Sequence, residues 1–264
     1  MDLKIIDISE QNAVFVVENI SVPFANTLRR TMTNEIPTMA VEYVDFEEND
    51  SAMFDEVIAS RLGLVPLTFN TSLYKMKDDC TCRGRGCSKC EVVLALEKTG
   101  PCTVKAGDLK SSADDVKPVD PEIPIMELLE NQRLKLQATA QLGLGIKHAK
   151  HKAAVVGYRN LANVRIKNEK CNNCGVCIDV CPKHIFVKKD GKVGTSSVQE
   201  CILCMKCVNQ CGNEAVSVSA NENAFVFSVE TVSGLSVREI VEQALDKIEK
   251  TASTFVSKIK KTLK

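Results

Sequence analysis

The sequence lacks tryptophan, and only 5% of its 264 residues are aromatic. Lysine plus arginine equals aspartate plus glutamate at 34 each, so the formal net charge of zero gives no global attraction to nucleic acid. No uninterrupted apolar run approaches the roughly 18 residues that a membrane span needs. The first ten residues alternate charged and apolar side chains and contain no signal-peptide core, so we expect a cytoplasmic protein without a membrane partner.

Cysteine, by contrast, is abundant in a chain that otherwise has the composition of a folded protein, with 44% hydrophobic and 26% charged residues. Of the thirteen cysteines, twelve fall into three groups of four, and Cys102 stands alone. Disulfide frameworks are typical of short secreted domains, whereas this chain is long and has ligand-like cysteine spacings. We therefore favour metal binding over a disulfide framework.

Residue patterns predict a mixture of strands and helices. Residues 3–9 and 13–19 are rich in β-branched side chains and predict a hairpin. A helix is expected between Pro23 and Pro37, followed by a strand over residues 39–48. A second helix should end at Gly63.

The middle of the chain is less regular, and we expect strands and loops there. Pro118, Pro121 and Pro124 favour an extended connector. The segment 126–145 predicts a short helix followed by a strand that ends near Gly143.

The last forty residues predict a strand over 225–232 and a long terminal helix. Ser236 and Glu239 form a capping-box pattern, and apolar residues then recur for about six turns. This helix could cover its own sheet or pack against another subunit. Its basic end, residues 257–264, suits a solvated helix terminus better than a nucleic-acid contact.

Eight cysteines form a duplicated iron-sulfur motif. Cys171, Cys174, Cys177 and Cys181 follow the C-x2-C-x2-C-x3-C-P spacing typical of bacterial cluster-binding runs, and the spacing recurs at Cys201, Cys204, Cys207 and Cys211. Paired zinc knuckles are the alternative, but eight cysteines at this spacing indicate two [4Fe-4S] clusters. Because the fourth cysteine of each run ligates the other cluster, we expect Cys171, Cys174, Cys177 and Cys211 to hold cluster 1, and Cys201, Cys204, Cys207 and Cys181 to hold cluster 2.

A third group offers four thiols within eleven residues: Cys80, Cys82, Cys87 and Cys90. Tetrahedral zinc suits it best, with a disulfide or a metal-free loop as the alternatives. His148 and His151 have no obvious metal partners, His184 is expected to pack beside the first run, and Cys102 to be a small packed or partly exposed thiol. The acidic segment 45–50 is interpreted as a solvated turn, since no Asp-x-Asp-x-Asp triplet or P-loop for phosphoryl chemistry is present.

The segment FANTLRRTMTNEIPTMAVEYVDFEENDSAMFDEVIASRLGLVPL resembles the signature region of the α-like subunits of DNA-directed RNA polymerase. Together with GLGIKHAK, the terminal FVFSVETVSGLSVREIVEQALDKIEK and the ferredoxin-like insertion, the whole chain resembles the D-type α-like family of archaeal RNA polymerases. The resemblance implies an α+β fold in which a dimerisation domain (1–42 and 222–264) contains an inserted, mainly β domain (43–221). Within that insert lies a (βαβ)2 ferredoxin-like iron-sulfur module (163–218).

The resemblance also implies a function in transcription. Such a chain would be a non-catalytic platform subunit of a nucleotidyltransferase, forming a heterodimer with the small α-like subunit L and joining the small subunits N and P and the large catalytic subunits. The interface residues it implies are Phe24, Leu28, Arg29, Arg30, Met32, Arg61, Val241 and Ile248.

Two other functions compete with this interpretation. A ferredoxin-type electron-transfer protein would explain the clusters but not the roughly 200 further residues. A DNA-binding protein is disfavoured by the zero net charge and by the lack of a basic-aromatic pattern, and no sequence-specific nucleic-acid binding is expected. Since family members differ in their cluster cysteines, we expect the clusters to be structural or redox-responsive.

Overall fold

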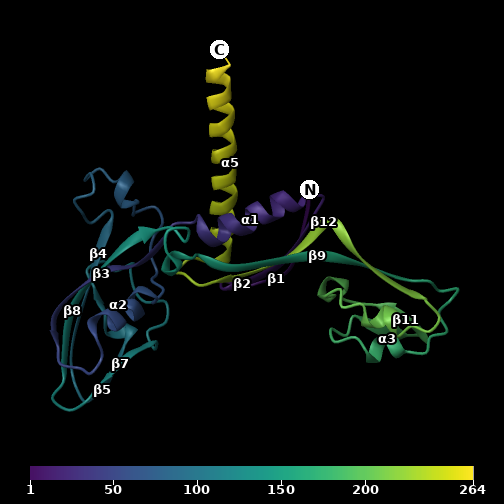
Figure 1. Cartoon of the computed structure of the whole chain (residues 1–264), viewed down its shortest axis with the longest axis horizontal. Helices are drawn as coiled ribbons and strands as arrows, with labels where there is room; N and C mark the ends of the chain where they lie inside the picture. The colour runs from purple at the N-terminus through teal and green to yellow at the C-terminus, as the bar shows by residue number, and fades with distance from the viewer. Residues whose placement is uncertain (264) are drawn as a thin grey trace. The chain divides into compact units, whose positions relative to one another are not determined.

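The computed structural model describes residues 1–263, which divide into two compact units (Figure 1). One unit combines Met1–Thr27 with Gly157–Ser228, and the other combines Leu28–Val156 with the residues from Val229 onward. Each unit is therefore assembled from two stretches that are far apart in the sequence.

A four-stranded sheet has the strand order β1-β2-β12-β9. Its strands are β1 (Asp2–Ile8), β2 (Asn12–Glu18), β12 (Val216–Thr231) and β9 (Ala154–Ile166). The predicted hairpin is confirmed, because β1 and β2 pair antiparallel. Aromatic rings fix its core: Phe15 stacks on Phe227 at 5.3 Å between centroids, and Tyr158 meets Phe225 edge-on at 5.5 Å.

The two cysteine runs lie between β9 and β12. The elements there are α3 (Val176–Asp179), β10 (Phe186–Lys189), β11 (Lys192–Thr195), the 3-10 turn η4 (Val198–Glu200) and α4 (Lys206–Asn209). Each run is followed by a strand: β10 follows the first run, and the start of β12 follows the second. At the base of this segment, Lys167 N–H donates to Ala215 O at 2.8 Å, which joins the two ends of the segment.

The second unit contains a sheet with the strand order β3-β8-β4-β6 and a separate pair, β5-β7. The strands are β3 (Thr38–Asn49), β4 (Glu91–Thr99), β5 (Cys102–Lys105), β6 (Lys110–Ser111), β7 (Pro124–Leu128) and β8 (Arg133–Gly143). Helix α2 (Asp55–Gly63) ends where predicted, and its Ile58 and Leu62 are fully buried in the core between these strands. Short 3-10 turns are η1 (Lys77–Asp79), η2 (Ala106–Asp108) and η3 (Ala149–His151).

Two expectations were wrong. The short helix expected after residue 126 is strand β7, which pairs with β5 and so satisfies its backbone hydrogen bonds in the sheet. An apolar run this short does not distinguish helix from strand. The acidic segment after Asp45 is no turn but the end of β3, where Glu47 and Glu48 pair with Lys135 and Arg133 of the neighbouring strand β8.

Helices α1 (Val22–Asn34) and α5 (Val237–Thr262) occupy the predicted segments. The capping box of α5 is confirmed: Ser236 Oγ accepts the Glu239 N–H, and the Glu239 carboxylate accepts the Ser236 N–H at 2.8 Å. Helix α5 buries Val237, Ile240 and Ala244 near its start, whereas Phe255 near its end is 64% exposed. No helix within residues 1–263 is both long enough and apolar enough to cross a membrane.

Candidate metal centres

The structure gathers Cys80, Cys82, Cys87 and Cys90 into one group in the loop between η1 and β4. Their sulfur atoms all lie within 4.8 Å of one another, with Cys80–Cys87 at 3.6 Å and Cys82–Cys90 at 3.7 Å. Thiolates around a tetrahedral zinc ion, each about 2.3 Å from the metal, are roughly 3.8 Å apart. The donor set fits zinc, and the shortest sulfur–sulfur distances match this spacing.

The protein environment shifts the pKa values of two of these thiols in opposite directions. Burial opposes ionisation of Cys82, but hydrogen bonds from Cys80, Cys90 and the Gly86 backbone outweigh it and lower the pKa of Cys82 to about 7. Burial raises the pKa of Cys90 to about 12. One thiol is thus disposed to be a thiolate before a cation binds, and a cation must displace the proton of another.

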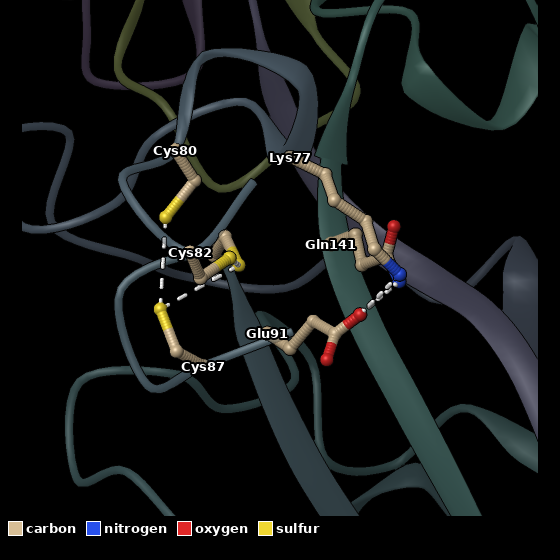
Figure 2. A network of polar contacts seen from close by, with 7 residues as sticks. Lys77, Cys80, Cys82, Cys87, Glu91 and Gln141 are labelled. Carbon is tan, nitrogen blue, oxygen red and sulfur yellow. Dashed lines mark hydrogen bonds and ion pairs between the residues drawn. The ribbon is translucent and has the colours of Figure 1, made fainter. Parts of the chain in front are cut away.

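A polar network that the sequence analysis missed anchors this loop (Figure 2). Glu91, the first residue of β4, accepts hydrogen bonds from Lys77 Nζ at 2.6 Å and from the buried Gln141 Nε2 of β8 at 2.8 Å. Lys77 lies in η1, at the other end of the cysteine loop. The network therefore ties both ends of the loop to the sheet. The one sequence signal for it is that Glu91 directly follows Cys90.

The two iron-sulfur runs line two separate cavities. Cys171, Cys174 and Cys177 share the first cavity with Cys211, the last cysteine of the second run. Cys201, Cys204 and Cys207 share the second cavity with Cys181, the last cysteine of the first run. The structure thus brings together the two sets of four that the crossover spacing predicts.

Both cavities combine exposed and buried thiols. Cys174 and Cys204 are exposed, whereas Cys177 and Cys207 are buried, and burial raises the pKa of both buried thiols. Cys211 Sγ accepts the Ala215 N–H at 3.3 Å, and backbone hydrogen bonds of this kind lower the pKa of its thiol. Four thiolates converging on one cavity are the donor set of a [4Fe-4S] cluster.

Cys102 and the three histidines do not belong to the three groups of four cysteines. Cys102 is partly exposed, as expected, and its thiol faces Thr99 O at 3.6 Å. His151 is buried, with Nδ1 at 3.0 Å from Thr38 O and Nε2 at 3.5 Å from the Glu42 carboxylate. His148 and His184 are exposed, so His184 is less packed against the first run than expected.

The predicted interface residues differ in their accessibility within this chain. Leu28 and Met32 are 4% and 0% exposed, so their apolar side chains already pack inside the chain. Arg30 and Arg61 are exposed, and Arg61 donates to the Ile125 carbonyl. The other four, Phe24, Arg29, Val241 and Ile248, are half-buried.

Comparisons with known proteins agree with both parts of this structure. Residues 44–158 match the model of the RNA polymerase Rpb3/RpoA insert domain, and residues 170–216 match that of the 4Fe-4S dicluster domain. The chain is 38% identical to DNA-directed RNA polymerase subunit Rpo3 of Methanosarcina acetivorans over 97% of both chains. It is also 38% identical to the Rpo3 subunit of Archaeoglobus fulgidus, over 93% of this chain and 92% of that one. The Rpo3 subunit of Thermococcus kodakarensis is 35% identical over 99% of this chain and 98% of its own.

The fold is therefore that of an RpoA-like insert domain joined to a 4Fe-4S domain. Since the similarity extends over nearly the whole length of several relatives, the chain belongs to the Rpo3 family of DNA-directed RNA polymerase subunits.

Proposed function

We propose that this chain is the non-catalytic assembly subunit of a DNA-directed RNA polymerase. The single observation that carries the proposal is the similarity to Rpo3 subunits over 97% of the chain. The side chains agree with it: the groups of potential metal ligands that the structure brings together are made of cysteines, whereas nucleotidyl transfer uses carboxylates that hold magnesium. A free electron carrier is disfavoured, because the similarity is not confined to the cluster module.

The partner for dimerisation is proposed to be the small α-like subunit L, with α5 as the main contact. Phe255, Val256 and Ile259 are 64%, 49% and 40% exposed on its second half. An apolar stripe of this kind on a solvent-facing helix is typical of a helix that packs against another subunit. Phe24 of α1 is proposed as a further contact with L, while Arg29, Arg30 and Arg61 are proposed to lie near contacts with the large subunits.

The domain boundaries implied by the family extend this proposal. Residues 1–42 and 222–264 would form the dimerisation domain, and residues 43–221 the insert that carries the ferredoxin-like (βαβ)2 module at 163–218. The assembled enzyme would further contain the subunits N and P and the large catalytic subunits.

Two [4Fe-4S] clusters are proposed to brace the insert. Cys171, Cys174, Cys177 and Cys211 would hold cluster 1, and Cys201, Cys204, Cys207 and Cys181 would hold cluster 2. When bound, such clusters supply one-electron redox chemistry and crosslink the segments that ligate them. The thiolates of each set come from two segments of the chain, so a cluster would join both runs and stabilise the fold of the module.

Zinc is proposed at Cys80, Cys82, Cys87 and Cys90. Its contribution to the order of this loop would be on the order of 10 kcal/mol, the apparent range for structural zinc sites. The cationic side chains Arg83, Arg85 and Lys89 in the loop offset the charge of the four thiolates.

The test is anaerobic purification of the tagged chain from its own cells, with counts of iron, sulfide and zinc and identification of the copurifying proteins. We expect large polymerase subunits, a small α-like subunit, about eight irons and one zinc per chain. A chain recovered alone, with no polymerase subunits, would contradict the proposed function.

A further inference from the structure

The two cysteine runs share an unusual backbone conformation at equivalent positions 30 residues apart. Asn173 and Leu203 have φ of 55° and 57°, and Gly175 and Met205 have φ of 89° and 61°. The two runs thus share the positions of their left-handed residues as well as the spacing of their cysteines. The residue types at these positions, however, differ between the runs.

The first loop, residues 171–177, uses residues suited to this conformation. Glycine tolerates positive φ without a steric penalty, and asparagine tolerates it better than most residues. Side chains add support: Asn172 Oδ1 accepts the Cys174 N–H at 3.2 Å, and Asn173 Oδ1 accepts the Val193 N–H of β11 at 2.9 Å. Lys188 of β10 also donates to the Asn173 carbonyl at 3.2 Å. The protein itself therefore fixes the shape of this loop.

The second loop, residues 201–207, places apolar side chains at the same positions. Leu203 and Met205 carry the steric cost of the left-handed region, and Ile202 and Leu203 cannot form the side-chain hydrogen bonds of Asn172 and Asn173. Leu203 packs against the core of the module, which offsets part of its strain. Met205 is 38% exposed and has less packing to offset its strain.

We propose that the two cluster sites are unequal, with the first loop shaped by the protein and the second held in its strained shape by its cluster, so that cluster 2 is released first. The inference rests on the proposed function in assuming two clusters. Met205 is the main positioning residue in this inference, because it carries strain with little compensating burial. Cluster release lets the second loop relax, whereas the first loop has less strain to relieve.

The experiment measures iron release from the full-length chain under anaerobic conditions with a chelator, followed by the loss of cluster absorbance. We expect two phases of similar amplitude. Met205→Gly should slow the fast phase by roughly tenfold and leave the slow phase unchanged, since relieving about 1.4 kcal/mol of strain corresponds to a factor of ten. Cys204→Ser, which removes a ligand of cluster 2, should abolish the fast phase and so assign it.

Gly175→Ala provides the reverse change. A Cβ at Gly175 meets nothing within 4 Å, so this substitution adds backbone strain without a clash and should accelerate the slow phase. Gly194→Ala is the matched control, because its Cβ also meets nothing within 4 Å and its φ is not positive. Both release phases should be unchanged in that variant.

The outcomes separate the inference from the proposed function. About eight bound irons released in a single phase, or no effect of Met205→Gly on either phase, would overturn the inference alone. A chain that takes up no iron would overturn the two-cluster proposal and the inference together. A fast phase that survives Cys204→Ser but is lost in Cys174→Ser would show that the order of release is reversed.

Discussion

The carboxylate of Glu91 occupies the space that a side chain on Gly86 would need. A Cβ built on Gly86 would lie 1.9 Å from Glu91 Oε2, and Gly86 also has a φ of 86°. Gly84 has a similar φ of 80°, but a Cβ there would meet nothing within 4 Å. Comparing substitutions at the two glycines therefore distinguishes the energetic cost of the left-handed conformation from the cost of displacing Glu91.

Gly86→Ala should weaken zinc retention by the cysteine loop more than Gly84→Ala does. Both substitutions add about 1–2 kcal/mol of backbone strain, but only the first one pushes on the carboxylate that Lys77 and Gln141 hold. Zinc content after competition with a graded series of chelator concentrations measures the difference. Equal losses in the two variants would show that the Glu91 network does not support the site.

Removing one exposed ligand from each cluster should affect assembly more than dimerisation. We expect the double variant Cys174→Ser and Cys204→Ser to lose cluster absorbance and to enter the complete polymerase poorly, while its pairing with the small α-like subunit changes less. The reason is that the proposed ligands lie in the segment between β9 and β12, whereas the proposed pairing helix α5 lies outside it. Anaerobic affinity purification with quantified subunit yields is the measurement.

Cys102→Ser is the control for that experiment, because Cys102 is a partly exposed thiol far in sequence from both runs. It should retain full absorbance and normal assembly. Normal incorporation of the double variant into the polymerase would remove the proposed bracing role of the clusters.

Charge on the exposed stripe of α5 should block pairing without unfolding the chain. Phe255→Asp changes a side chain that is 64% exposed, so the free energy of unfolding of the isolated chain should change by less than about 0.5 kcal/mol. Binding of the small α-like subunit should weaken at least tenfold, since an apolar anchor is replaced by a charge. Titration calorimetry or light scattering of the purified pair would measure it.

Ser257→Asp adds the same charge at an exposed position on the other side of α5 from Phe255 and Ile259, because two residues in either direction turn a helix by about 200°. It should leave pairing intact. Equal weakening by both substitutions would indicate a general charge effect and not an apolar contact.

We expect the free energy of unfolding of the unit that contains His151 to fall at acidic pH. Burial lowers the pKa of this imidazole, despite hydrogen bonds to Thr38 and Glu42 that favour the protonated form. The unfolded chain therefore binds a proton at higher pH than the folded one does, so the stability contributed by neutral His151 is present above about pH 6.5 and is lost as the pH falls towards the folded pKa.

Denaturant unfolding between about pH 8 and about pH 5 measures this dependence. His151→Gln should lower stability overall but flatten the loss between these two pH values, whereas His148→Asn, at an exposed histidine, should keep the wild-type slope. An unchanged slope in His151→Gln would place the pH dependence in other groups.

Sequence patterns predicted the local elements best where one chemical rule dominates. The Ser236–Glu239 capping box specified the start of α5, and Gly63 marked the end of α2. The duplicated cysteine spacing likewise predicted which thiols share a cavity, because the crossover follows from the geometry of one compact loop.

The features that sequence patterns miss depend on contacts between distant segments. Gln141 reaches Glu91 across two paired strands, and no local pattern links residues 50 positions apart. Strand β7 differs from the predicted helix because its partner β5 decides its conformation. Leu28 and Met32 follow a helical apolar pattern, but periodicity alone does not tell whether the apolar face packs inside the chain or against a partner.

The hydrogen bond between Lys167 and Ala215 has an evolutionary consequence. The two ends of the inserted segment are already in contact. The stability of the flanking sheet therefore depends little on the length of the segment, because closing a longer loop costs only slightly more entropy. The cysteine-bearing segment could thus be acquired, trimmed or stripped of its metal ligands as a cassette, while the strands on either side keep their pairing.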